Sequence, residues 1–253
     1  GADPWEAARA ESGRPPIPWV PQTYVCPPAP GALAIDGRID EAQWERAPWS
    51  RDFIDIVGAS KPAPRLRTRR KLLWDEEHLY VAAELEEPHL QATFTERDSY
   101  IYQEDHDFEV FLDPNADTHD YFELELNALG TEWDLLLRTP YRDWDEHVRL
   151  HGLTEEEKAE GPALHHWDMQ GLRTAVHLDG TLNDPSDTDR GWTIEIAIPW
   201  EVFDVTAIDN QHFGDFRWQL FRRRGQWDIN TVNHRHQQND NGCGLQRLHD
   251  SPP

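Results

Sequence analysis

The chain has 253 residues, a charged fraction of 28 % and a formal net charge of −24 at pH 7. This length suits one large domain, or one domain with ordered extensions. Such a negative field argues against nucleic acids and anionic membranes as partners, and it favours neutral ligands or cations. No stretch approaches the roughly 20 apolar residues that a membrane-spanning helix needs, so we expect a soluble protein.

The N-terminal stretch, residues 1–23, is rich in proline and predicts a surface arm rather than a folded unit. We expect the folded module over residues 24–230 and a polar tail over 231–253. The chain does not begin with the charged and apolar segments of a signal peptide. We expect an extracytoplasmic protein, secreted or periplasmic, whose signal peptide is not part of this chain. Cys26 and Cys243 fit either one disulfide or two separate thiols.

Short apolar runs separated by turn-rich loops dominate the rest of the chain and predict strands. In chain order these runs are 32–37, 53–56, 65–75, 78–87, 107–112, 121–127, 132–138, 172–178, 191–199 and 216–223. Their spacing predicts an all-β protein, with an antiparallel β-sandwich of the jelly-roll or immunoglobulin-like kind, or a barrel, as its architecture.

Two stretches predict helix instead of strand. Residues 41–47 should form a short helix, with Asp40 as N-cap, Gln43 three residues later and Pro48 as the stop. Residues 143–166 are polar and predict a helical or mobile insertion, in which Thr154 is a suitable N-cap.

The hairpin of residues 105–127 alternates apolar and acidic side chains with a period of two. Its apolar members should face the core, which places Glu109, Glu123 and Glu125 together on the opposite face. One interpretation is the solvated outer face of an antiparallel sheet. The other is a surface that binds a polar ligand.

The loop inside this hairpin carries Asp113, Asn115 and Asp117 at alternate positions, a spacing with which a loop wraps a hard cation such as Ca²⁺. It is not an EF-hand, because Thr118 stands where glycine is needed. An Asx-rich turn without an ion is the alternative. For the second acidic loop, residues 183–189, we favour the turn.

Several blocks in order resemble carbohydrate-binding modules of family 9, in particular free-standing bacterial proteins that are similar to the modules attached to xylanases. The blocks are IDGRIDEAQWERAPW (35–49), LLWDEEHLYVAAELEEPHL (72–90), TERDS (95–99), HDFEVFLDPNADTHDYFELELNALGTEWDLLL (106–137) and LNDPSDTDRGWTIEIAIPW (182–200). The resemblance implies a sandwich of two antiparallel sheets, bound calcium, and a site for the end of a plant-type polysaccharide such as xylan or cellulose.

The resemblance also suggests roles for individual residues. The sugar-contacting glutamate of the family falls on Glu109, and a carboxylate suits this role because it accepts strong hydrogen bonds from two adjacent hydroxyls. The acidic position before the proline falls on Glu87. Glu123 stands where xylanase-linked modules have an arginine, so Arg224 is a candidate to supply the missing donor. The candidate ligand-binding residues are Glu87, Tyr102, Glu109, Glu123, Glu125, Asn127, Trp133, Arg224 and Trp227.

The aromatic positions depart from the family pattern. Tyr102 is the ring nearest to the glutamate strand, and residues 233–253 contain no second stacking tryptophan, which leaves Trp133 and Trp227 as candidates. Twelve tryptophans serve equally well as core residues or as rings for sugar stacking.

Two other functions stay open from the sequence. Neighbouring carboxyls on the hairpin can meet the separation of about 5 to 9.5 Å that glycoside hydrolysis requires, although no nucleophile elbow or phosphate loop is present. An enzyme that cleaves glycans oxidatively is a variant of this enzymatic hypothesis. An interaction protein that has lost its sugar site is the third class. We expect a non-catalytic binding module with structural calcium.

Overall fold

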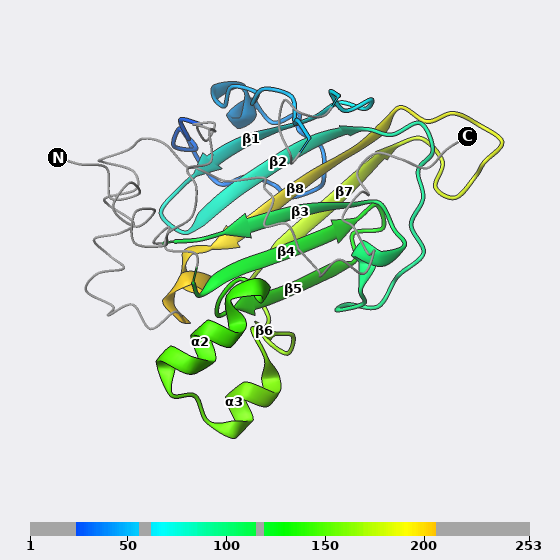
Figure 1. Ribbon diagram of the computed structural model, residues 1–253. Coiled ribbons are helices and arrows are strands. Elements are labelled where there is room, and N and C mark those ends of the chain that lie inside the picture. The colour runs from blue at the N-terminus through cyan, green and yellow to red at the C-terminus, as the bar shows by residue number, and fades with distance from the viewer. Residues whose placement is uncertain (1–23, 56–61, 115–118, 206–253) are drawn as a thin grey trace.

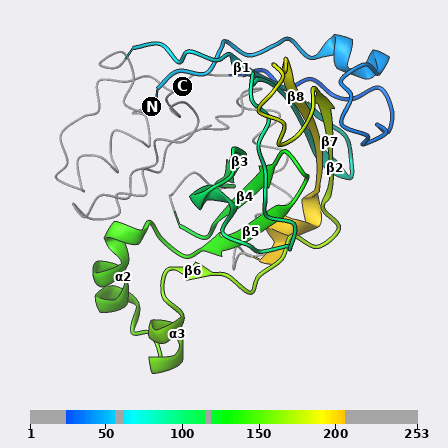
Figure 2. The ribbon, with the colours of Figure 1, turned by 90° about the vertical axis from the view of Figure 1, so that its right-hand side faces the viewer.

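The computed structural model describes residues 24–55, 62–114 and 119–205, arranged as two antiparallel four-stranded sheets. The first sheet has the order β1 (Thr68–Trp74), β2 (His78–Glu86), β8 (Gly191–Pro199) and β7 (Arg173–Asp179). The second has the order β3 (Asp107–Leu112), β4 (Tyr121–Asn127), β5 (Glu132–Leu137) and β6 (Ala163–Leu164). Figure 2 shows the sheets as two layers. The predicted all-β sandwich is confirmed.

The main core lies between the two sheets. Alternation along each strand turns one set of side chains inward, where Phe108, Val110 and Leu112 of β3 meet residues of β2 and β8. The other inward residues of the hairpin are Phe122, Leu124 and Leu126, and all three are buried. Burial of each large apolar side chain stabilises the fold by about 1.5–3 kcal/mol.

Both outer faces are covered as well. On the first sheet, Leu33 and Trp44 pack over Leu73 and Tyr80. On the second, the segment before β3 contributes Ile101, which joins a cluster of outward-facing side chains. Those side chains are Phe111, Tyr121, Trp133, Leu135 and Leu137. The outer face of the hairpin is therefore largely enclosed by protein, which differs from the solvated face that alternation alone permits.

Glu195 of β8 holds the N-terminal segment against the first sheet. Its carboxylate accepts hydrogen bonds from the backbone N–H groups of Asp36 and Gly37, both at 3.0 Å, and from Nε1–H of Trp44 at 2.6 Å. Burial raises the pKa of Glu195 to about 7. The bend that reaches this carboxylate, with φ of 84° at Gly37, explains why residues 32–37 form no strand.

Several predicted boundaries need correction. Residues 53–55 form no strand, although Phe53 N–H donates to the carbonyl of Thr68 on β1 at 2.8 Å. The predicted helix is a 3₁₀ turn over Ala42–Arg46 that starts from Glu41 without a side-chain cap, so Asp40 as N-cap was wrong. Strand β6 is too short for periodicity to reveal. Further 3₁₀ turns are Ile101–Gln103, Tyr141–Asp143 and Trp200–Val205.

The polar insertion is helical, with α2 (Trp144–His151) and α3 (Glu155–Glu160) lying beyond β5 and β6 in Figure 1. Thr154 caps α3 in a reciprocal capping box with Glu157, as predicted. Arg138 donates to the carbonyls of Glu157 and Gly161 and so holds the end of α3 to the sheet. In the described part of the chain, no helix has the length and apolar character needed to cross a membrane.

Several sequence predictions concern residues outside the described ranges, among them the arm of residues 1–23 and the tail of residues 231–253. Cys26 is a buried free thiol, whereas Cys243 is not described. The predicted strand over 216–223 also lies outside.

The close approach of Gly37 to β7 leads to a stability prediction. A Cβ at Gly37 would lie 2.5 Å from the carbonyl carbon of Val176 and would also strain a positive φ. We expect Gly37→Ala to destabilise the protein by about 2–4 kcal/mol in urea unfolding. Gly31→Ala is the matched control, because its Cβ would meet nothing within 4 Å. Equal stability of the two variants would contradict this account.

Candidate functional site

The acidic residues of the hairpin lie side by side on the outer face of β3 and β4. Glu109 is directly opposite Glu125, and Asp107 is opposite Asn127, in the antiparallel register. Glu123 is two residues from Glu125 and therefore on the same face. We call Asp107, Glu109, Glu123 and Glu125 the carboxylate quartet. The structure thus brings together three residues predicted from the sequence and adds Asp107.

Three members of the quartet are almost fully buried. Asp107 is 4 % exposed, and Glu123 and Glu125 are each 2 % exposed, whereas Glu109 is partly accessible. Asp107, Glu109 and Glu125 each offer one oxygen, and these three atoms lie within 4.8 Å of one another.

Burial is the main cause of the raised pKa values in the quartet. It raises the pKa of Glu109 to about 7. The pKa values of Asp107 and Glu123 are raised well above the usual range by burial first and by the charge of Glu109 second. For Glu125 the second cause is the charge of Asp107. Like charges in a poorly solvated place oppose ionisation, so the quartet holds protons near neutral pH unless a cation compensates.

Asn127, a predicted ligand-binding residue, has a structural role here. Its Nδ2 donates to the Phe94 carbonyl and to Asp105, and its Oδ1 accepts from the N–H groups of Leu129 and Thr131. These contacts use both donors and both lone pairs of the amide, so none is left for a ligand.

An aromatic group borders the quartet. Trp133 of β5 is opposite Glu125 and stacks against Tyr102, with ring centroids 5.1 Å apart. Tyr100 and His165 both contact Trp133 at their rings. Trp133 is buried, while Tyr100 is 48 % exposed, so Tyr100 and Tyr102 present rings to solvent above a supporting tryptophan. Sequence reasoning missed Tyr100 and His165; the signal for Tyr100 was its position two residues from Tyr102.

The remaining predicted site residues lie elsewhere or outside the described ranges. Glu87 follows β2 in the other sheet, where its carboxylate lies 3.0 Å from Nδ1 of His106. Asp113 follows β3 and is partly buried. Asn115, Asp117, Arg224 and Trp227 are not described.

The acidic loop of residues 183–189 is a turn, as we favoured from the sequence. Asp189 accepts from the N–H groups of Leu90 and Thr181, at 2.8 and 2.7 Å. Asn183 exchanges two hydrogen bonds with the backbone of Ala92. These oxygens are therefore occupied by the chain's own donors.

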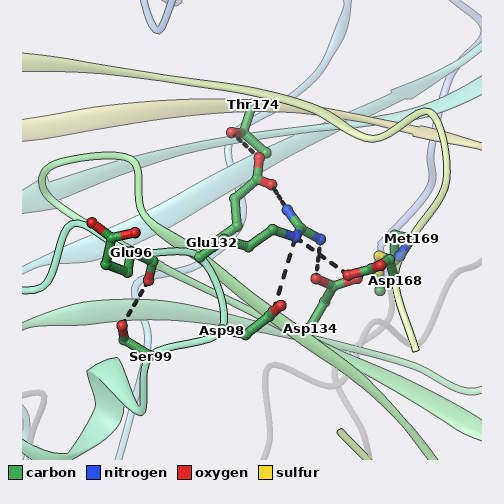
Figure 3. Close-up of polar contacts among 9 residues, drawn as sticks. Glu96, Asp98, Ser99, Glu132, Asp134, Asp168, Met169 and Thr174 are labelled. Atoms are coloured by element: carbon green, nitrogen blue, oxygen red, sulfur yellow. Dashed lines mark hydrogen bonds and ion pairs between the residues drawn. The ribbon is translucent and has the colours of Figure 1, made fainter. Parts of the chain in front are cut away.

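Arg97 provides the positive charge for a second acidic cluster, whose members Glu132, Asp134 and Asp168 are labelled in Figure 3. Its guanidinium forms ion pairs with Glu132 and Asp134 of β5 and lies 3.4 Å from Asp168. Glu132 in turn accepts from the hydroxyl of Thr174 on β7 at 2.6 Å. Burial raises the pKa of Asp134 to about 6 even beside Arg97. The hydrogen bond between Thr174 and Glu132 links β7 of the first sheet to β5 of the second, and Arg97 balances the acidic charge at this link.

Comparison with known proteins finds one matching family model, which covers about half of the chain. The family model described as "Carbohydrate family 9 binding domain-like" matches residues 35–160. A search of curated proteins finds no match.

Among solved structures, the chain is similar to a family 9 carbohydrate-binding module from Caldicellulosiruptor kristjanssonii in complex with cellotriose. The identity is 21 % and the TM-score 0.41, over 69 % of this chain and 66 % of that one, just under two thirds of its length. The same module in complex with glucose matches at 21 % identity and TM-score 0.41, over 68 % and 67 % of the two chains. A protein from Bacteroides uniformis, described as a candidate carbohydrate-binding protein, matches at 12 % identity and TM-score 0.47, over 74 % and 78 %.

The Arg97 network predicts a cost for removing its cation. Arg97→Met leaves the carboxylate of Asp134 buried without its ion pair, and we expect a loss of about 2–3 kcal/mol in urea unfolding at pH 8. Arg190→Met is the control, because Arg190 is 85 % exposed in its pair with Asp179, and it should cost less than about 0.5 kcal/mol. Similar losses for both variants would show that Arg97 does not compensate a buried charge.

The raised carboxyl pKa values predict how stability depends on pH. The pKa of Glu109 rises from 4.5 to about 7, so the folded state binds more protons than the unfolded state in this interval. Stability that is present below pH 4.5 is therefore lost as the pH rises to 7. Glu195 and Asp134 act in the same direction, whereas the lowered pKa values of His147 and His165 oppose them.

The difference between wild type and Glu109→Gln isolates the contribution of Glu109. In chelator, we expect the variant to be more stable than wild type at pH 8 by at least about 1 kcal/mol, and this advantage to shrink at pH 5. Urea unfolding at the two pH values measures it. An advantage that does not change with pH would contradict the raised pKa of Glu109.

Proposed function

We propose that the chain binds the end of a neutral glycan chain without cleaving it, on the premise that residues 35–160 match the family model described as carbohydrate family 9 binding domain-like. The ligand class that we propose is a plant-type polysaccharide, xylan or cellulose, or its oligosaccharides. The binding surface is the part of the outer face of β3, β4 and β5 that stays accessible at Glu109, Tyr100 and Tyr102.

One observation carries this proposal: an accessible carboxylate and a ring platform lie in the same row of the sheet. Glu109, Glu125 and Trp133 are consecutive partners across β3, β4 and β5. Strands are about 4.8 Å apart, so Glu109 lies roughly 10 Å from Trp133 along this row. That span suits one or two sugar rings, with hydroxyls at Glu109 and a C–H face on Tyr102 or Tyr100.

The burial of the quartet favours binding over hydrolysis. A glycoside hydrolase needs two carboxyl groups that both reach the scissile bond. Within the quartet only Glu109 is accessible, because Asp107, Glu123 and Glu125 are enclosed. Glu109 can therefore accept hydrogen bonds from a sugar but has no second exposed carboxyl beside it within the quartet.

We also propose a structural Ca²⁺ at Asp113, Asn115 and Asp117. The alternate spacing of oxygen ligands after β3 supports it, since a carboxylate-rich loop of this kind suits a hard cation. An extracytoplasmic location is consistent with a protein that meets polysaccharide, and we propose it as well.

The proposed glycan site predicts a loss of affinity in Glu109→Gln. At pH 8, above the pKa of Glu109, the amide replaces a charged acceptor, so we expect the affinity for cello- or xylo-oligosaccharides to fall by about 10- to 100-fold in calorimetric titration. Tyr102→Ala should also weaken binding, because a stacking ring is lost. Glu156→Gln, on the exposed surface of α3, should bind as wild type does.

Each mixture should also be analysed for new reducing ends. Their appearance would favour the glycoside hydrolase, and oxidised products would favour oxidative cleavage. Unchanged affinity of Glu109→Gln would remove Glu109 from the site. If wild type binds none of these sugars, the proposal is wrong, and the hypothesis of an interaction protein that has lost its sugar site replaces it.

A further inference from the structure

The carboxylate quartet lacks hydrogen-bond donors for oxygens that are fully enclosed. Oδ2 of Asp107, Oε2 of Glu123 and Oε2 of Glu125 are buried without a partner. Asp105, two residues before Asp107, shows what the same segment can provide: it accepts from Thr93 N–H and Oγ1–H, from Phe94 N–H and from Asn127 Nδ2–H. The fold therefore supplies hydrogen-bond donors to both oxygens of Asp105 but leaves oxygens of the neighbouring carboxylates without a donor.

Nothing among the described residues supplies the missing positive charge. The ion pairs of lysine and arginine in the described part of the chain are formed with acids outside the quartet, as is that of Arg97 with Asp134. A buried carboxylate without donors or a cation costs several kcal/mol, and natural structures place few such groups. Three such carboxylates lie close together on β3 and β4. Their clustering points to a positively charged ligand that binds between them.

The geometry of the quartet fits a hard divalent cation. Two oxygens that each lie 2.3–2.6 Å from Ca²⁺ can be about 5 Å apart at most. Asp107, Glu109 and Glu125 already hold one oxygen each within 4.8 Å of the others. The fourth acid, Glu123, projects from the same face with its free oxygen enclosed.

We propose that Asp107, Glu109 and Glu125 bind one divalent cation of the calcium type, with Glu123 next to it. This site is separate from the one proposed in the loop of residues 113–117, since it uses strand residues on the outer face of the sheet. The ion lies beneath the accessible side of Glu109, so it forms the floor of the glycan-binding face. The cation site does not depend on glycan binding.

The test measures binding of CaCl₂ alone to the metal-stripped full chain by calorimetric titration, with thermal unfolding as a second readout. The quartet variants are Glu125→Gln and Asp107→Asn, which keep the side-chain shape and remove one charge. The loop variant Asp113→Asn/Asp117→Asn removes the other proposed site, and Glu156→Gln is the surface control. No glycan is present, so failure here leaves the proposed function untouched.

We expect each quartet variant to bind one ion fewer than wild type, while the loop variant keeps the quartet ion. At Ca²⁺ about a hundredfold above its Kd, wild type should unfold roughly 5–10 °C higher than in chelator. The loop variant should keep the part of this temperature shift that comes from the quartet ion. Glu125→Gln should lose that part. In chelator it should unfold at the same temperature as wild type or higher, because one buried like charge is gone. A variant that merely damaged the fold would unfold lower.

Two results would overturn the proposal. One is wild type that binds no Ca²⁺, which would mean that protons or another part of the chain neutralise the quartet. The other is wild-type stoichiometry in both Glu125→Gln and Asp107→Asn, which would assign all bound ions to other residues.

Discussion

A carboxylate enclosed by protein must meet hydrogen-bond donors, a cation or a proton, and this chain depends on that constraint because it carries 48 acidic residues against 24 basic ones. The structure meets it in three ways. Asp105 and Glu195 accept from backbone and side-chain donors. Asp134 is paired with Arg97. The quartet has neither arrangement among the described residues and holds protons in the absence of a cation.

These buried acids also decide which segments cover the sheets. Glu195 reaches the segment before β1, and Asp105 with Asn127 joins the segment before β3 to the turn between β4 and β5. The apolar clusters on both outer faces form beneath segments attached in this way. The buried polar groups thus determine where the covering segments pack on the sheets, and burial of apolar side chains supplies most of the stability. The proposed glycan-binding face is the part of the sheet that these segments leave accessible beside Glu109.

The strands and the pairing of Glu109 with Glu125 could be predicted from the sequence, since a period of two fixes which side chains share a face. What lies over that face could not, because Phe94, Tyr100 and His165 come from loops whose contacts have no periodicity. Asn127 shows the same limit: its position on the acidic face was clear, but its four hydrogen bonds depend on segments far along the chain. Similarly, residues 32–37 have strand composition, yet Glu195 draws their backbone into a bend.

The helical insertion between β5 and β6 contributes no buried residue from either α2 or α3. It contacts the sandwich through the guanidinium of Arg138, the stacked rings of His147 and His119, and the two pairs of β6 with β5. A segment attached so sparingly can change in length or composition while the sheets keep their geometry. The turn at Gly152 is therefore a suitable position for a reporter dye or an affinity tag, with which the proposed binding to polysaccharide could be followed without altering either sheet.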